Sequence, residues 1–248
     1  MKSFRLSEVK TCLVLGGGDI GMALARVIKK RNPNTEIIIT KRKIEYVSPK
    51  EREKFVLYPH DPLSEESWSS LSNTIKSNFG HLDLVISTYG ILHDNELSPE
   101  KKIEDIALSG LVKAFQVNTF TAPLAVKHLL KLMPRESLST FVFLSAKVGS
   151  ISDNSTGGWY AYRSSKASLN MMVKNMAIEF KNRKKNALAV AIHPGTTATE
   201  LSRPYLSNFN LKVWEPNQTA EHILRVIDGL KPDNNGDFLN WDGTIIPY

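Results

Sequence analysis

The chain has 248 residues, of which 42% are hydrophobic and 23% are charged. These fractions are typical of a soluble globular protein, and the length suits one α/β domain with a large core. No run of about 18 apolar residues is present, so we expect neither a transmembrane helix nor a membrane partner. We expect one domain over residues 1–248, because no linker, internal repeat or low-complexity segment interrupts the sequence.

The formal net charge of +7 raises the question of nucleic-acid binding. Outside the N-terminal half, the densest basic cluster consists of Lys181, Arg183, Lys184 and Lys185. This cluster falls at the end of a long helical pattern, where cations suit the helix dipole and face water. We therefore expect no nucleic-acid partner.

The N-terminus and the cysteine content bear on the cellular compartment. Residues 1–10 are polar and lead into an apolar strand, without the apolar core and cleavage site of a signal peptide. The single cysteine, Cys12, excludes a disulfide framework and a cysteine-based zinc site. His60, His93 and His193 show no metal-ligand spacing. We expect a cytoplasmic protein without a bound metal.

Apolar segments of strand length alternate with helical patterns along the chain. The strand candidates are residues 11–15, 36–40, 54–58, 82–87, 140–145, 187–192 and, with a weaker pattern, 237–240. Most are continuously apolar, which is typical of strands buried on both faces of a parallel sheet. The helix candidates are residues 20–31, 64–78, 99–132, 160–181 and 219–230. This alternation predicts a doubly wound Rossmann domain, with seven parallel strands, helices on both faces and ligands at the carboxyl ends of the strands.

The first strand candidate runs into a glycine-rich turn, residues 15–21, with the sequence LGGGDIG. Glycines let the backbone turn tightly and approach a pyrophosphate, whose charge then faces a helix N-terminus. A glycine-rich turn without a ligand is the alternative, but the position between the first strand and the first helix favours a dinucleotide site. The spacing departs from G-x-G-x-x-G, so the motif alone is only moderately specific.

The end of the second strand bears on which dinucleotide would bind. Three cations follow Thr40, namely Lys41, Arg42 and Lys43. An NAD site would carry an acidic residue here, whereas a 2′-phosphate needs cations, so the segment favours NADP over NAD. A basic solvated turn is the alternative. After the third strand, Asp61 is placed to contact the adenine amino group, and it could equally start a turn with Pro62.

Tyr162 and Lys166 are four residues apart in a predicted helix, which places a phenol and an ammonium on one face. A cation beside a phenol favours the phenolate and lowers the phenol pKa from about 10. A phenol tuned in this way can donate or accept a proton at a reacting centre. The spacing alone is weak evidence, because both residue types are common on helix surfaces.

Further motifs make the chain resemble the short-chain dehydrogenases/reductases over essentially its whole length. In the family's order and spacing, they are residues 16–21, residues 87–90, Asn118, Ser145, Tyr162 with Lys166, and residues 194–199. Within the family, the chain is most similar to the C-factor-like and sniffer-like carbonyl reductases. That similarity lies in residues 145–154, 157–160 and 241–243.

The resemblance implies a catalytic group made of Ser145, Tyr162, Lys166 and Asn118. Ser145 would hydrogen-bond the substrate carbonyl oxygen, and Tyr162 would donate a proton to it as hydride arrives from the nicotinamide. Lys166 would lower the phenol pKa and bind the nicotinamide ribose. Asn118 would hold a water that relays protons to Lys166, and the alternative is a helix irregularity satisfied locally. Residues 194–199 would cover the nicotinamide, with Thr197 or Thr199 near its carboxamide.

The predicted cofactor site combines these implications with the two motifs read from the residues. Its members are Gly16, Gly18, Ile20, Gly21, Lys41, Arg42, Asp61, Thr88, Gly90, Tyr162, Lys166, Pro194, Gly195, Thr197 and Thr199.

The chain departs from the family pattern at three places. The glycine turn is one residue shorter than T-G-x-x-x-G-x-G, and the N-N-A-G run appears as Ser87-Thr88-Tyr89-Gly90. The usual Ser-Ser pair appears as Ser145-Ala146, which leaves the catalytic serine open between Ser145 and Ser150. We favour Ser145 because it ends a strand candidate, whereas Ser150 lies beyond a glycine on a segment that is free to move.

Together these features predict an NADP-dependent oxidoreductase that interconverts a carbonyl and an alcohol, with Tyr162 as general acid/base. The alternative is a cofactor-binding regulator, or a C-factor-like signalling protein with little turnover. The expected partners are a small carbonyl or alcohol substrate and further copies of the chain, since relatives are often dimers or tetramers. His93, Trp159 and Tyr205 could line the substrate pocket.

Overall fold

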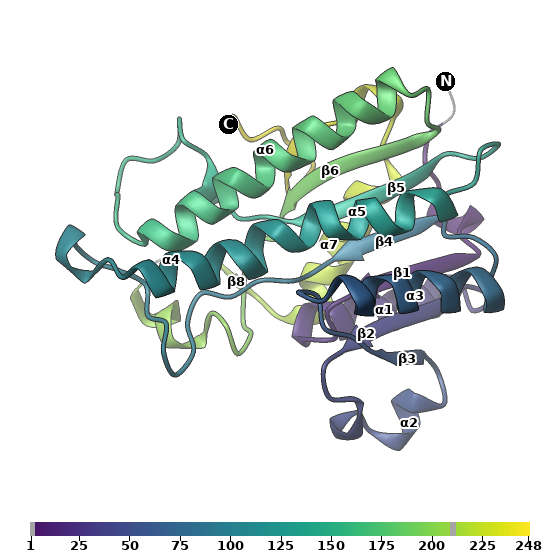
Figure 1. The fold of residues 1–248 in the computed structure, drawn as a ribbon, viewed down its shortest axis with the longest axis horizontal. Coiled ribbons are helices and arrows are strands. Elements are labelled where there is room, and N and C mark those ends of the chain that lie inside the picture. The colour runs from purple at the N-terminus through teal and green to yellow at the C-terminus, as the bar shows by residue number, and fades with distance from the viewer. Residues whose placement is uncertain (1–2, 209–211) are drawn as a thin grey trace.

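The computed structural model describes residues 3–208 and 212–248. Its main sheet has seven strands in the order β3-β2-β1-β4-β5-β6-β9 (Figure 1). These strands are Thr11–Leu15 (β1), Glu36–Lys41 (β2), Val56–Pro59 (β3), Leu84–Ser87 (β4), Ser139–Leu144 (β5), Ala187–His193 (β6) and Phe238–Asn240 (β9). Every neighbouring pair in this sheet is parallel. The predicted seven-stranded, doubly wound sheet is confirmed.

Helices cover both faces of the sheet. They are Asp19–Arg31 (α1), Pro49–Arg52 (α2), Glu65–Asn78 (α3), Leu108–Phe115 (α4), Thr121–Leu129 (α5), Tyr160–Asn182 (α6) and Pro216–Asp228 (α7). Helices α1 and α7 pack on one face, and α3, α5 and α6 pack on the other. None of the helices in the described part of the chain combines the length and apolarity that crossing a membrane would require.

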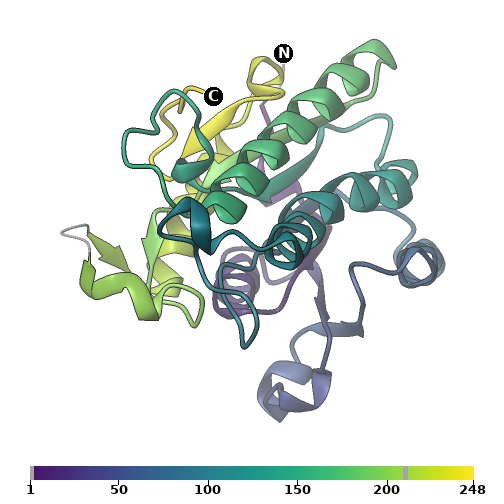
Figure 2. The same cartoon turned by 60° about the vertical axis from the view of Figure 1, so that its left-hand side comes forward.

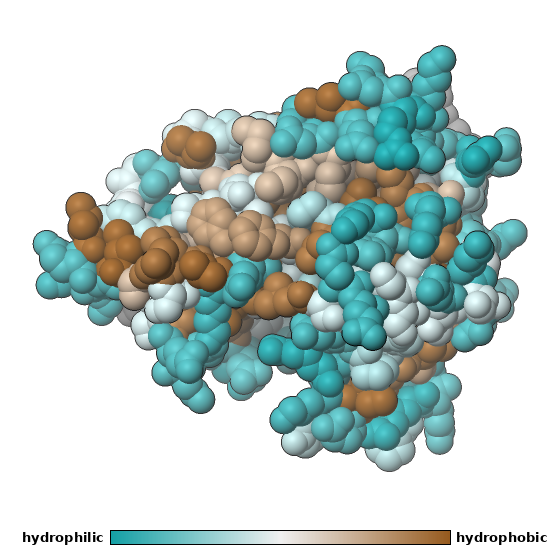
Figure 3. Space-filling view, in the orientation of Figure 1, coloured by the Kyte–Doolittle hydropathy of each residue, from teal (hydrophilic) through white to brown (hydrophobic). Residues whose placement is uncertain are grey.

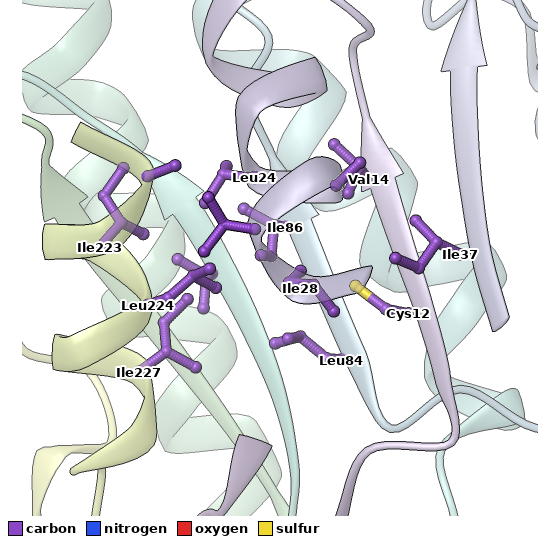
Figure 4. Packing of buried hydrophobic residues seen from close by; sticks show 14 of the residues in the cluster. Cys12, Val14, Leu24, Ile28, Ile37, Leu84, Ile86, Ile223, Leu224 and Ile227 are labelled. Atoms are coloured by element: carbon purple, nitrogen blue, oxygen red, sulfur yellow. The ribbon is translucent and has the colours of Figure 1, made fainter. Parts of the chain in front are cut away.

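Side chains alternate along each central strand between the two faces. In β1, Cys12 and Val14 pack with α1 and α7 (Figure 4), whereas Leu13 and Leu15 pack with the helices on the other face. All four side chains are fully buried, and each apolar side chain of this size stabilises the fold by about 1.5–3 kcal/mol. This double burial is why the strands appear as continuous apolar runs. It also raises the pKa of the Cys12 thiol, so the free cysteine behaves as a small apolar residue.

The prediction of one helix over residues 99–132 is wrong in two respects: the α-helix starts later, and it is interrupted. Helix α4 begins at Leu108, and a five-residue π-helical turn, Gln116–Phe120, separates it from α5. Helix α7 begins three residues before the predicted start, because Glu215 and Gln218 form a reciprocal capping box ahead of Pro216.

A second sheet, which the sequence did not predict, pairs Thr196–Thr197 (β7) with Val213–Trp214 (β8). Figure 2 shows this small sheet in light green, projecting from the body of the molecule. Ala198 N also donates to Trp214 O, which extends the pairing by one bond. The segment after β6 is thereby held at the carboxyl edge of the main sheet, where a ligand would bind.

Candidate active site

The carboxyl ends of the central strands bring distant motifs to one edge of the sheet. In register, Leu15 at the end of β1 lies between Thr40 of β2 and Ser87 of β4. The glycine turn, the segment 88–90 and the cations at the end of β2 therefore surround the end of the first strand. Ser145 N donates to Ile192 O, which places the serine beside the end of β6.

The glycine turn is closed so tightly that side chains do not fit at two of its positions. A Cβ at Gly21 would lie 2.0 Å from Gly16 O, and one at Gly16 would lie 2.7 Å from Thr88 Oγ1. Gly18 instead faces open space, and its extended backbone starts α1 without a side-chain cap. The first N–H groups of a 13-residue helix are thus left for an anion, which suits a pyrophosphate. Ile20 packs its side chain on the core.

Tyr89 adds a hydrogen-bond network behind this turn that the sequence analysis missed. Gly16 N donates to Thr40 Oγ1 at 3.0 Å, and the Tyr89 hydroxyl lies 2.8 Å from the same oxygen. Thr88 Oγ1 donates to Gly16 O at 2.7 Å. Burial raises the pKa of Tyr89, so it stays a neutral phenol. The only available signal was the replacement of the family's small alanine by tyrosine.

The two cations predicted to bind a phosphate have different surroundings. Lys41 Nζ donates to Gly17 O at 2.7 Å, so it steadies the glycine turn. Arg42 is exposed, and its positive charge acts on the Tyr89 phenol by lowering the pKa. The carboxylate of Asp61 accepts from Leu63 N at 3.0 Å, which is the turn that the sequence analysis gave as the alternative. Arg42 is therefore the better placed of the two cations for a ligand phosphate.

Tyr162 and Lys166 lie in the first two turns of α6. Lys166 is 3% exposed, its Nζ donates to Leu144 O at 2.9 Å, and it lies 5.9 Å from the centroid of the Tyr162 ring. Burial raises the pKa of Tyr162 to about 12 and lowers the pKa of Lys166 to about 8. The expected lowering of the phenol pKa is thus not seen, because loss of water around the buried phenol raises it.

Asn118 lies in the π-helical turn, and its side chain joins that turn to the segment after β4. Its Oδ1 accepts from Ile91 N at 2.7 Å, and its Nδ2 donates to Ile91 O at 3.0 Å and Ser165 Oγ at 2.9 Å. Because both N–H donors are used, this geometry favours local anchoring of Ile91 over a water-holding side chain. A Cβ at Gly90 would lie 3.6 Å from Lys166 Nζ and 3.8 Å from Asn118 Oδ1, so the three residues meet.

Both candidate serines donate their hydroxyl protons inside the fold. Ser145 Oγ, 4% exposed, donates to Asn170 Oδ1 at 2.7 Å. Ser150 Oγ donates to Pro247 O and accepts from Asp153 N at 3.2 Å. A hydroxyl has one proton to give, so either serine must change partner before it can donate to a substrate.

The segment after β6 differs at its two threonines. Thr197 is buried, and its hydroxyl lies 2.8 Å from that of Thr219 in α7. Thr199 is half-buried and bonds Ser202 within the same segment. Of the two, Thr199 is the more accessible to a nicotinamide carboxamide. Pro194 and Gly195 begin this segment, and Gly195 packs against Trp214 and Trp241.

A row of aromatic rings leads away from Tyr162. Trp159 meets Tyr162 edge to face at 6.2 Å, Tyr205 meets Trp159 at 5.4 Å, and His93 meets Tyr205 at 5.6 Å between ring centroids. His93 Nε2 also lies 3.1 Å from Leu201 O. His93, Trp159 and Tyr205, the three predicted pocket residues, therefore lie side by side and next to Tyr162, although they come from three separate segments.

The chain is similar in sequence to known oxidoreductases. Residues 10–209 match the model of the short chain dehydrogenase family. C-signal of Myxococcus xanthus is 30% identical over 144 residues, which cover 58% of this chain and 82% of that protein. Uncharacterized oxidoreductase C663.09c of Schizosaccharomyces pombe is 29% identical over 145 residues, which cover 54% of this chain and only 56% of that protein.

The fold is similar to that of two solved carbonyl reductases. Sniffer of D. melanogaster has a TM-score of 0.84 and 21% identity, covering 97% of this chain and 100% of that chain. The NADPH-bound carbonyl reductase from chicken fatty liver has a TM-score of 0.84 and 22% identity, covering 99% and 100%. With the family model matched over most of the sequence, the chain belongs to the short-chain dehydrogenase/reductase family of oxidoreductases.

Proposed function

We propose that the protein interconverts a carbonyl and an alcohol by hydride transfer with NADP, with Tyr162 as general acid/base. The observation that carries the proposal is the meeting of Tyr162 and Lys166 with Gly90 and Asn118 at the carboxyl edge of the sheet. A protein that only sensed a dinucleotide would need the glycine turn, but not a buried tyrosine–lysine pair. We also propose that residues 1–248 form one domain of this family, since the family model matches residues 10–209.

The residues present fit a dinucleotide phosphate. Gly16, Gly18, Ile20 and Gly21 would hold the pyrophosphate at the α1 N-terminus, and Arg42 would bind the 2′-phosphate. The chicken carbonyl reductase of similar fold binds NADPH, which supports NADP over NAD. Lys41 and Thr88 would support the glycine turn rather than contact phosphate. Asp61 would face the adenine.

The chemistry divides between cofactor and protein. When bound, the nicotinamide supplies or accepts the hydride. Tyr162 stays protonated at neutral pH, because its pKa is about 12, and it donates that proton to the carbonyl oxygen as negative charge develops there. Lys166 would bind the ribose hydroxyls with its ammonium and ease proton release from the phenol. Pro194, Gly195 and Thr199 would cover the nicotinamide, while Thr197 holds that segment to α7.

A serine would orient the carbonyl, and we retain Ser145 for this role. Asn170 Nδ2 is buried without a hydrogen-bond partner in the described residues. Turning the Asn170 amide over would make Nδ2 donate to Ser145 Oγ, which frees the serine proton for the substrate. The expectation that Ser150 lies on a segment free to move is wrong, because Ser150 is 2% exposed and its hydroxyl donates to Pro247 O.

Ser145→Ala should therefore lower turnover on the order of 100-fold, as for loss of one donor to a developing oxyanion. Ser150→Ala should leave turnover nearly unchanged. Steady-state kinetics of the two variants decide between the serines. A large loss in Ser150→Ala with a normal Ser145→Ala would reverse the assignment.

The pH dependence of reduction should report Lys166. Burial lowers its pKa to about 8, so the ammonium is present below that pH and lost as the pH rises through it. We expect kcat/KM for reduction to be flat below about pH 8 and to fall above it by roughly tenfold per pH unit. In Lys166→Arg, the falling limb should move to higher pH, because a guanidinium keeps its proton. A limb that stays in place in this variant would show that another group is responsible.

A panel of aldehydes and ketones assayed with NADPH tests the proposed function. Turnover of at least one carbonyl class above the rate without enzyme supports it. The second candidate is a cofactor-binding regulator or a signalling protein, and the 30% identity to C-signal favours that candidate. Tight NADPH binding with no turnover across the panel would support the regulator instead.

We also propose that the protein self-associates and that it is located in the cytoplasm. Exposed apolar side chains gather around the start of α4, where Figure 3 shows a brown patch on the left of the molecule. They belong to Ile103, Ile106, Leu108 and Val112. An apolar surface of this kind supports the proposed dimer or tetramer. The proposed compartment is the cytoplasm, and the proposed partner is a small carbonyl or alcohol.

A further inference from the structure

The helix that carries Tyr162 begins without a cap of its own. Trp159, at the N-cap of α6, has a left-handed backbone (φ 51°, ψ 44°) and gives no side-chain capping bond. Helix N-caps are usually Ser, Thr, Asp or Asn, whose side chains accept from the first N–H groups. Those groups need an acceptor from elsewhere, because an unpaired buried N–H is costly.

Glu100 supplies the missing acceptors from 61 residues earlier in the chain. Its backbone oxygen accepts from Trp159 N at 2.6 Å. Its two carboxylate oxygens lie 3.3 and 3.2 Å from Ala161 N. The residue is only 4% exposed, so the carboxylate is committed to this helix end. A negative charge is also favourable at the N-terminus of a 23-residue helix.

The chain before α6 is shaped to reach Glu100. Gly157 and Gly158 both have φ near 64°, and a Cβ on Gly158 would lie 3.4 Å from Glu100 O. The two glycines thus bring the backbone against Glu100 immediately before the helix starts. This contact also holds Trp159 in a left-handed conformation that is unfavourable for a non-glycine residue.

Tyr162 is the residue after Ala161, and its ring rests edge to face on Trp159 at 6.2 Å. Trp159 and Ala161, the two residues that fix the phenol in place, therefore both donate a backbone N–H to Glu100. We propose that Glu100 is a positioning residue for catalysis, which sets the placement of the Tyr162 phenol through Ala161 and Trp159. This proposal rests on the proposed acid/base role of Tyr162. Glu100 itself would touch neither substrate nor cofactor.

Two substitutions separate positioning from loss of charge. Glu100→Ala removes the acceptor and should lower kcat on the order of 10- to 100-fold, since misplacement of a reacting group by about 1 Å has that effect. NADPH affinity should stay within about twofold, because the glycine turn and Arg42 are untouched. Glu100→Gln keeps an oxygen that can accept from Ala161 N and should recover most of the lost kcat. If Glu100→Ala does not fold, Glu100→Asp, whose carboxylate is one methylene short, replaces it.

Asp83→Ala is the matched control. Asp83 is 8% exposed, and its Oδ2 accepts from Lys10 N at 2.8 Å and Thr11 N at 3.0 Å. It is a buried carboxylate that holds backbone N–H groups, but at the amino end of β1, on the opposite edge of the sheet. Asp83→Ala should lower Tm and leave kcat nearly unchanged. An equal fall of kcat in both alanine variants would overturn the proposal in favour of general destabilisation.

Amide hydrogen exchange gives a readout that needs no turnover. In Glu100→Ala, the Ala161 amide should exchange faster than in the wild type, whereas amides in α3 should not change. Unchanged protection of Ala161 would refute the cap, and faster exchange with an unchanged kcat would refute the positioning role. If the wild type reduces no carbonyl in the panel, the proposed function and the positioning role fail together. The exchange experiment still decides the cap itself.

Discussion

Tyr162→Phe should lose about 10²- to 10⁴-fold in turnover while it still folds and binds NADPH. The substitution removes only the hydroxyl, so the ring keeps its edge contact with Trp159 and its place in the first turn of α6. Without the phenol, the proposed general acid that protonates the carbonyl oxygen is missing. Steady-state kinetics with a carbonyl from the panel, together with an NADPH titration, measure both parts of the expectation.

Tyr160→Phe is the control, because Tyr160 lies in the same helical turn and has no role in the proposed mechanism. Its turnover should stay close to that of the wild type. Retained activity in Tyr162→Phe would remove Tyr162 from the mechanism. Loss of NADPH binding in that variant would instead point to a structural defect.

Arg42→Ala should weaken NADPH binding by about 1–3 kcal/mol, the range for loss of a charge-assisted hydrogen bond. NADH binding should change little, because NADH carries no 2′-phosphate. Arg42 is exposed beside Tyr89 and Thr40, whereas Lys41 is bonded to Gly17 O. Fluorescence titrations of both cofactors with the wild type and the variant give the four affinities.

Lys43→Ala is the matched control, because it also removes a cation from this segment. Lys43 Nζ lies over the ring of Tyr46, 5.8 Å from the ring centroid. It should leave the preference for NADPH unchanged. A wild type that binds NADH as tightly as NADPH would contradict the assignment of the 2′-phosphate site. Equal weakening of both cofactors in Arg42→Ala would show a general effect on the turn.

The sheet could be predicted because each of its central strands leaves a pattern within a few consecutive residues of the sequence. Each central strand is buried on both faces, so it appears as a continuous apolar run, as Leu13 and Val14 illustrate. The glycine turn was recognisable for a similar reason, since Gly16 and Gly21 meet within six residues. Contacts between residues that are close in the chain constrain the residue types at those positions, so they can be recognised in the sequence.

The details around the phenol depend on contacts between distant segments. Asn118 lies in the π-helical turn that interrupts the long helix, and it bonds Ile91, 27 residues earlier in the chain. Glu100 caps α6 from 61 residues away. No periodicity reveals either contact. The sign of the pKa shift of Tyr162 was also missed. Spacing reveals the nearby lysine but not the depth of burial, which raises the pKa to about 12.

Transfer of a deuterium label from the cofactor to the product would show that this protein catalyses hydride transfer. NADPH carrying deuterium as the transferred hydride would be given to the wild-type protein with a carbonyl substrate from the panel. Mass spectrometry would then locate the label. We expect alcohol product with deuterium on the carbon that carries the hydroxyl, and about 10²- to 10⁴-fold slower labelling with Tyr162→Phe. Alcohol product without deuterium would contradict the proposed hydride transfer. NADPH that binds to the protein but is oxidised by none of the carbonyls in the panel would contradict it as well.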